Sequence, residues 1–349
     1  MKGYQMLTDV KIIDFTNYLP GPFATLRLAE LGAEVIKIEG PNGDPARHLE
    51  PIVQGQGVLF TGNNRGKHSH FLNLKDTRDL NKVKELILEA DVIIESFRPG
   101  VMKRLTLDYD TVRKYHPTIV YCSLVGYGEN TFYSTFGSHD LNYMAISGML
   151  AQWKDDKGRP IHPSQQIADL VGGIVASERI LAGLVQRGIY GIGSYHQVSM
   201  ADTMTALMGN HHLIHQATEM KKGVEVLAGT IVNYCLYETS DNRYMALGAL
   251  EKKFWQAFCL AVDHPEWTSC HMREVSDPIY KQVCTVFKER SFTDWMDFSE
   301  QVDCCLTPVL EIDEVPKSNY HQQRGNFIFH DNWSRIQQYS DLRNSQKKK

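Results

Sequence analysis

The first half of the chain alternates short, apolar, β-rich runs with helical stretches, and this alternation limits the possible folds more than any other feature. Residues 10–15 form a β-rich run, residues 23–31 are typical of a helix that ends at Gly32, and residues 35–38 form the next run. A strand, a helix and a strand within about 30 residues match the size of a βαβ unit.

The same pattern continues further along the chain. The apolar residues between 80 and 87 share one helical face, and strands are expected at 91–95 and 118–124. Strands that alternate with helices imply an α/β fold, in which helices cover both faces of a mostly parallel sheet. An α+β fold with mixed strand pairing is the alternative.

The second half of the chain has a different pattern. From residue 169 to 208 we expect long helices interrupted at Gly188–Gly193. From about 227 to 310, short strands such as 244–247 precede helical segments such as 254–261. This change indicates a second, smaller α+β domain.

Composition and charge exclude several classes of function. Hydrophobic residues make up 42% and charged residues 22%, as in ordinary globular proteins. The balance of 37 Lys and Arg against 41 Asp and Glu gives a net charge of −4, which argues against a general nucleic-acid partner. No apolar stretch approaches the roughly 20 residues of a membrane span, and residues 1–6 lack the apolar core of a secretory signal. We therefore expect a cytoplasmic protein with no membrane partner.

Metal and nucleotide motifs are not supported by the sequence. The seven cysteines contain no C-x-x-C pair, which favours reduced thiols over disulfides or a zinc site. His211, His215 and Glu219 share one predicted helix face and could hold a metal, although ordinary surface histidines are the simpler interpretation. Neither a dinucleotide nor a triphosphate glycine motif is present.

Two basic segments could bind an anion. Asn64–Lys67 places a glycine between basic residues, which lets the backbone approach an anion closely, with a solvated loop as the alternative. Residues 96–100, followed by Lys103 and Arg104, come directly after an expected strand. In parallel sheets ligands bind beyond the carboxyl ends of the strands. The alternative here is a turn with surface charges.

Two further segments could carry proton chemistry. Residues 138–143 include His139, a residue type suited to proton transfer near neutral pH, although a lone histidine beside an aspartate is often structural. Asp169 lies at the predicted start of a long helix, where a plain N-cap is the alternative. Gly172 and Gly173 would weaken the first turns of that helix, which makes sense if another segment packs closely there.

In this order the four segments resemble the class III CoA-transferase family, also called CaiB/BaiF, over about residues 7–328. Its N-terminal marks are Leu19-Pro20-Gly21-Pro22, the stretch 31–39 and Asn64–Lys67. Asp169 falls where that family places its catalytic aspartate.

Three local matches favour the α-methylacyl-CoA racemase branch of the family. They are His-Asp-Leu-Asn-Tyr at 139–143, Gly-Ala-Leu-Glu-Lys-Lys-Phe at 248–254 and Asp-Cys-Cys-Leu-Thr-Pro-Val at 303–309. The chain departs from that branch at 228–232, where the branch has a glycine-rich stretch, and at Gly40, where the branch has an arginine that contacts CoA.

The resemblance implies a particular architecture. We expect a Rossmann-like large domain over 1–200, completed by a C-terminal return over 315–349, with linker helices over 201–226 and a small α+β domain over 227–314. It also implies two interlocked copies of the chain, with the active site between domains.

For activity, the resemblance implies an enzyme that acts on CoA thioesters. The leading expectation is racemisation of a 2-methylacyl-CoA through an enolate, with His139 and Asp169 as the acid/base pair and Glu251 bonded to the histidine ring. The first alternative is a CoA transferase in which Asp169 attacks the thioester and CoA moves between carboxylic acids. The second is a non-catalytic CoA-thioester-binding protein.

The resemblance also implies the residues that contact the acyl-CoA. They are Leu72, Asn73, Leu74, Lys75, Ser96, Phe97, Arg98, Arg104, Ser138, Asp140, Asn142 and Tyr143. Lys75 and Arg104 are the expected phosphate partners because both are cationic donors. No metal and no permanently bound cofactor is implied, since coenzyme A arrives as part of the substrate.

Overall fold

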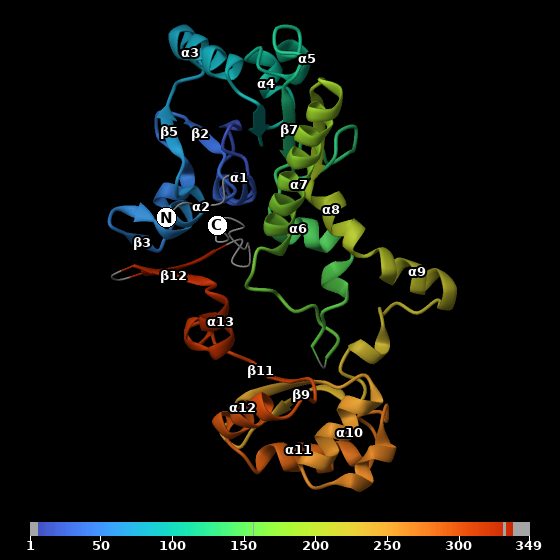
Figure 1. The fold of residues 1–349 in the computed structure, drawn as a ribbon. Coiled ribbons are helices and arrows are strands. Elements are labelled where there is room, and N and C mark those ends of the chain that lie inside the picture. Colours follow the sequence, from blue (N-terminus) through green and yellow to red (C-terminus); the bar gives the residue numbers. More distant parts are fainter. Residues whose placement is uncertain (1–5, 156, 331–332, 338–349) are drawn as a thin grey trace. The chain divides into compact units, whose positions relative to one another are not determined.

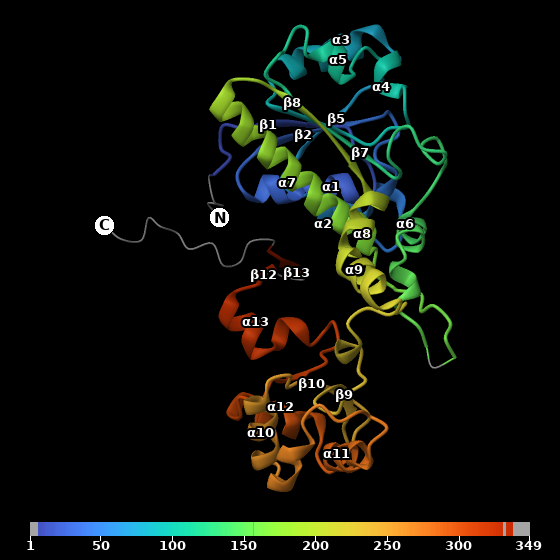
Figure 2. The same cartoon turned by 90° about the vertical axis from the view of Figure 1, so that its right-hand side faces the viewer.

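The computed structural model describes residues 6–155, 157–330 and 333–337. Its contacts divide the chain into two units, one of Met1–Gly209 with Ile328–Lys349 and one of Asn210–Phe327. Figures 1 and 2 show the order of their elements. No helix in the described ranges has both the length and the apolar character needed to cross a bilayer.

A six-stranded sheet forms the centre of the first unit. Every neighbouring pair in it is parallel, in the order β5-β2-β1-β6-β7-β8, so the expected α/β architecture is confirmed. Its strands are β1 (Lys11–Asp14), β2 (Glu34–Glu39), β5 (His68–Phe71), β6 (Val92–Glu95), β7 (Val120–Val125) and β8 (Ser194–Ser199).

Helices cover both faces of this sheet, because alternate strand residues supply two separate cores. Ile12 and Val92 pack in one core with residues of α1 and α7, whereas Ile13 and Ile93 pack in the other with residues of α3 and α4. Figure 2 shows α1 and α7 along one face and α3 to α5 on the other. The helices of this unit are α1 (Pro20–Glu30), α2 (Val58–Asn64), α3 (Thr77–Leu88), α4 (Val101–Arg104), α5 (Tyr109–Val112), α6 (Asp140–Ile146), α7 (Ile167–Tyr190) and α8 (Met200–Leu207).

Strand β8 corrects the sequence prediction, which expected only helices between 169 and 208. Helix α7 ends at Gly191, whose φ of 70° lies in the left-handed region that favours glycine. At Gly193 a Cβ atom would lie 2.2 Å from the carbonyl oxygen of Ile119, so only glycine lets the chain turn in beside β7. The prediction missed this strand because its sequence, Ser-Tyr-His-Gln-Val-Ser, contains a single β-branched apolar residue.

Short elements complete the first unit and connect it to the second. They are the 3₁₀ helices η1 (Pro45–His48) and η2 (Met149–Ala151), the hairpin β3 (Ile52–Val53) and β4 (Gln56–Gly57), and the pair β12 (Phe327–His330) and β13 (Trp333–Ile336).

The second unit has its own core and an antiparallel sheet in the order β11-β10-β9. Trp255, Trp295 and Phe287 are fully buried in that core. Its elements are α9 (Gly209–Thr218), η3 (Glu225–Leu227), β9 (Tyr234–Glu238), β10 (Tyr244–Gly248), α10 (Lys252–Ala261), η4 (Pro265–Cys270), α11 (Pro278–Lys288), α12 (Phe292–Gln301), β11 (Leu306–Pro308), η5 (Val315–Lys317) and α13 (Asn319–Arg324).

Candidate functional site

A cavity of about 500 Å³ lies in the first unit, beside the carboxyl ends of the parallel strands. Its walls include residues 17–20 after β1, 96–99 after β6 and 124–127 at the end of β7. His139 and Asp169 both line it. Ligands of open α/β folds bind at this edge of the sheet, because the loops that follow the strands gather there. We call it the site cavity.

Asp169 is the third residue of α7, whose N-cap is Gln166. Its backbone N–H donates to Oδ1 of Asp140 at 3.0 Å, so a carboxylate from the neighbouring segment caps the first turn. Burial and, to a lesser extent, the negative charge of Asp140 raise the pKa of Asp169 from 3.8 to about 7. A carboxyl group with a pKa near neutrality can both accept and return a proton.

The two glycines after Asp169 allow close packing, as the sequence predicted. A Cβ atom on Gly173 would lie 2.6 Å from the carbonyl oxygen of Pro20, and one on Gly172 would lie 2.8 Å from Cγ of Met200. Pro20 and Met200 also line the site cavity. The first turns of α7 are therefore fixed directly against two walls of the cavity.

His139 is the N-cap of α6, and its side chain is exposed on the site cavity. Its backbone N–H donates to Oδ1 of Asn142 at 3.0 Å. The observed roles of Asn142 and of the buried Asp140 are thus to hold the starts of α6 and α7, and neither side chain lines the cavity. Their predicted contact with the ligand stays a prediction.

Ser138 and Tyr143 form a neutral polar pair on the cavity wall. Their hydroxyl oxygens are 2.9 Å apart, and burial raises the pKa of the Tyr143 phenol above its ordinary value of 10. Gly126 makes room for this pair, since a Cβ atom there would lie 2.4 Å from the phenolic oxygen of Tyr143. The phenol stays protonated at neutral pH and is available to donate a hydrogen bond.

Some of the predicted CoA contacts line the site cavity and others lie outside it. Ser96, Phe97 and Arg98 line the site cavity. The side chains of Lys75 and Arg104 are exposed at the same edge of the sheet, after β5 and on α4, but they do not line the cavity.

The other predicted residues after β5 take part in the core packing and hydrogen bonding of the fold. Leu72 is buried in the core on the α3 side, so its side chain has almost no surface for a ligand. Oδ1 of Asn73 accepts from the N–H of Lys75 at 3.1 Å, and Leu74 packs against the same core.

The anion-binding interpretation of Asn64–Lys67 is wrong for Lys67. Its side chain is fully buried, and Nζ lies 3.3 Å from Oδ2 of Asp14 and donates to the carbonyl oxygen of Pro22 at 2.9 Å. Burial lowers the pKa of Lys67 to about 8, partly offset by the charge of Asp14. Arg65 pairs with Glu30. The basic residues of this stretch therefore hold the fold together.

Glu251 lies in the second unit, where it is the N-cap of α10. Its predicted bond to the ring of His139 stays a prediction.

Several cavity residues were missed by the sequence prediction. Asn17 and Tyr18 come from the loop after β1, Ala46 from η1 and Leu59 from α2. The signal that could have found Asn17 and Tyr18 is their place beyond the carboxyl end of a parallel strand, the rule that pointed to residues 96–98.

No three His, Cys, Asp or Glu side chains come together as a metal site would require, within the ranges that the structure covers. The polar groups of the cavity are instead one carboxyl, one imidazole, hydroxyls, amides and the guanidinium of Arg98.

The chain is similar in sequence both to a racemase and to a CoA-transferase. The chain is 28% identical to human alpha-methylacyl-CoA racemase over 92% of this chain and 82% of the relative. It is 32% identical to mouse succinyl-CoA:glutarate CoA-transferase over 88% of this chain and 73% of the relative.

Solved structures have the same fold. Rv3272 from Mycobacterium tuberculosis superposes with a TM-score of 0.81 at 26% identity, over 96% of this chain and 92% of that one. The family model described as CoA-transferase family III matches residues 7–343, and the chain therefore belongs to that family.

Proposed function

We propose that this protein racemises the α-carbon of a 2-methylacyl-CoA by proton transfer. The observation that carries the proposal is that Asp169, whose pKa is raised to about 7, lines one cavity together with His139. Inversion of a carbon next to a thioester carbonyl needs a base on one face and an acid on the other. A carboxyl group whose pKa lies near neutrality, together with an imidazole, suits this task.

In the forward direction, ionised Asp169 removes the α-proton and the electron pair moves onto the thioester oxygen to give an enolate. Protonated His139 then returns a proton to the opposite face, and the two residues exchange roles for the reverse direction. The start of α7 supports the enolate oxygen through its positive dipole end. Glu251 would fix the tautomer and the charge of the His139 ring.

Coenzyme A would extend from the site cavity along the same edge of the sheet. Arg98 on the cavity wall and the exposed side chains of Lys75 and Arg104 offer three cations for its phosphates. The leading alternative is CoA transfer between carboxylic acids through a thioester on Asp169. The similarity to the mouse succinyl-CoA:glutarate CoA-transferase supports this alternative.

Exchange of the α-proton in D₂O separates the two reactions. The purified protein is given a 2-methylacyl-CoA with no second carboxylic acid present, and the α-position is followed by NMR. Deuterium uptake with loss of chirality supports racemisation. Trapping of an Asp169 thioester by hydroxylamine, without α-exchange, would support transfer. CoA binding without either reaction would indicate a binding protein.

We also propose that the working unit is an interlocked homodimer, as the family resemblance implies. Sedimentation at nanomolar concentration should then show a dimer that does not dissociate on dilution. A monomer under those conditions would contradict the proposal.

A further inference from the structure

Two walls of the site cavity come from segments that are far apart in the sequence. One is the loop after β1, which contributes residues 17–20, and the other is η1 with its flank, which contributes Ala46 and Leu49. Asp44 joins them. Its Oδ1 accepts from the backbone N–H of Tyr18 at 3.1 Å and from that of Ala46 at 2.9 Å.

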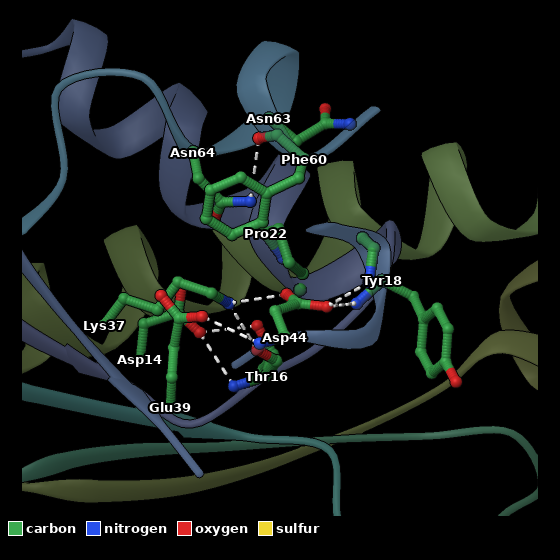
Figure 3. Close-up of polar contacts among 12 residues, drawn as sticks. Asp14, Thr16, Tyr18, Pro22, Lys37, Glu39, Asp44, Phe60, Asn63 and Asn64 are labelled. Carbon is green, nitrogen blue, oxygen red and sulfur yellow. Dashed lines mark hydrogen bonds and ion pairs between the residues drawn. The ribbon is translucent and has the colours of Figure 1, made fainter. Parts of the chain in front are cut away.

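Lys37, on β2, holds Asp44 from the other side. Its Nζ lies 3.0 Å from Oδ2 of Asp44 and donates to the carbonyl oxygen of Thr16 at 2.6 Å. Figure 3 shows Lys37 and Asp44 pointing toward each other, with the backbone of Tyr18 on the far side of the carboxylate. Both side chains are 0% exposed. In the described part of the chain, Lys37 is the only partner found for that oxygen of Asp44.

The loop that this pair holds is strained. Tyr18 has a φ of 64°, a left-handed conformation that is uncommon for a residue with a side chain. Such a conformation persists only where the surroundings impose it. The bonds of Thr16 to Lys37 and of Tyr18 to Asp44 fix the loop on both sides of this turn.

The same loop continues to the helix that carries Asp169. Pro20 follows two residues after Tyr18, and its carbonyl oxygen packs against Gly173, one turn along α7 from Asp169. The loop that forms this cavity wall therefore packs directly against the helix that carries Asp169. No contact places Lys37 or Asp44 themselves on the cavity wall.

We propose that Lys37 and Asp44 are positioning residues for the acyl-CoA: as a pair they set the separation of the two cavity walls through Tyr18 and Ala46. This inference rests on the proposed function, since it takes the site cavity to be where the CoA thioester binds. The pair interacts electrostatically with a second buried pair, Lys67 with Asp14, so these two pairs together are balanced in charge. Removal of one charge leaves its partner buried and uncompensated, whereas removal of both restores the balance.

The test uses Lys37→Met, Asp44→Ala and the double variant Lys37→Met/Asp44→Asn in the full-length protein. An asparagine at 44 keeps a carbonyl oxygen for the N–H groups of Tyr18 and Ala46. We expect each single variant to raise KM for a 2-methylacyl-CoA about tenfold with kcat nearly unchanged, because uniform binding is lost. The double variant should recover most of the KM. Arg187→Met is the control, since it breaks a part-buried pair with Asp91 away from the cavity.

Binding of CoA by calorimetry and the melting temperature are measured on every variant. A Lys37→Met protein whose KM matches that of Arg187→Met would overturn the inference. So would a double variant that regains the melting temperature but not the KM. If Lys37→Met does not fold, the double variant and Asp44→Ala still give the comparison.

Failure of the proposed function is distinguishable from failure of this inference. In that case the wild-type protein itself would not exchange the α-proton, whether or not it binds CoA. A crystal structure of Lys37→Met then decides the positioning role alone. We expect Tyr18 to leave the left-handed region and the two walls to separate, and an unchanged loop would refute the role.

Discussion

The backbone N–H of Asp169 donates a 3.0 Å hydrogen bond to Oδ1 of Asp140, so the group that caps the helix also places a negative charge beside the candidate catalytic carboxyl. The start of a helix by itself lowers the pKa of a carboxyl group. Here burial and the charge of Asp140 outweigh that effect and raise the pKa of Asp169 to about 7. This outcome favours Asp169 as a base that works near neutrality.

Replacement of Asp140 by asparagine should lower the pKa of Asp169. The variant keeps an oxygen for the N–H of Asp169 but removes the negative charge, so ionisation becomes easier. Because ionised Asp169 is the base, the limb of the kcat/KM profile near pH 7 should move to lower pH. The pH profile of α-proton exchange measures this shift. Asp140→Ala, which also loses the hydrogen bond, is the comparison. If the limb of the pH profile of Asp140→Asn stays in place or moves to higher pH, the assignment of Asp169 as the base is contradicted.

Asp169→Asn should abolish exchange and transfer while the fold persists. The amide cannot accept the α-proton or attack a thioester, but it has nearly the same shape. Residual turnover near the wild-type level would exclude Asp169 as the central residue.

The same variant should change the dependence of stability on pH. The folded wild-type protein holds the proton of Asp169 up to about pH 7, whereas the unfolded chain loses it near the ordinary pKa of 3.8. The stability that this carboxyl contributes is therefore full below about pH 4 and is lost as pH rises to about 7. Denaturant unfolding between about pH 4 and pH 7, the interval between these two pKa values, should show a shallower decline for Asp169→Asn than for the wild type.

The sequence predicted four of the six strands, β1, β2, β6 and β7, because each is rich in apolar residues, and it missed β5, whose sequence is His-Ser-His-Phe, as well as β8. Residues 91–95 and 118–124 read as buried runs and are β6 and β7. Strand β8 was missed because Ser194, His196 and Gln197 carry no strand signal of their own, and its pairing with β7 is a tertiary effect.

The sequence pointed to site residues where the side-chain chemistry and the position along the chain both suggested a site. Asp169, His139 and Arg98 all line the cavity. Lys67 was misassigned because a basic residue next to a glycine has the same sequence pattern whether it faces an anion or a buried carboxylate. Only the fold brings Asp14, 53 positions earlier, against its ammonium group. Likewise, nothing local in the sequence joins Tyr18 to Asp44.

Two glycines of α7 offer a matched pair of substitutions. Gly173→Ala places a Cβ atom 2.6 Å from the carbonyl oxygen of Pro20, whereas Gly188→Ala meets nothing within 4 Å. The first should destabilise the protein by about 1–3 kcal/mol through overpacking and lower activity by moving the cavity wall. The second should stabilise the helix by up to about 1 kcal/mol and leave KM unchanged. Denaturant unfolding and KM check both, and equal effects of the two variants would show that close packing at Gly173 is unimportant.

His139→Ala separates the two enzyme chemistries. In a racemase the imidazole serves one face of the α-carbon, and loss of a general acid or base costs about 10²–10⁴-fold in rate. Asp169, held at the start of α7 by Asp140, can still exchange the proton on its own face. Exchange should therefore become stereospecific, so that one enantiomer of a 2-methylacyl-CoA takes up deuterium and the other does not.

In a transferase the same variant should behave differently. The attack on the thioester belongs to Asp169, and an exposed His139 would only shape the cavity. CoA transfer should then fall modestly, with no difference between enantiomers. The measurement is proton–deuterium exchange by NMR on each enantiomer, wild type against variant, with Asp169→Asn as the inactive reference. Racemisation that falls far more than single-face exchange identifies His139 as the second proton carrier, whereas equal exchange of both enantiomers rules out that role and favours the transferase.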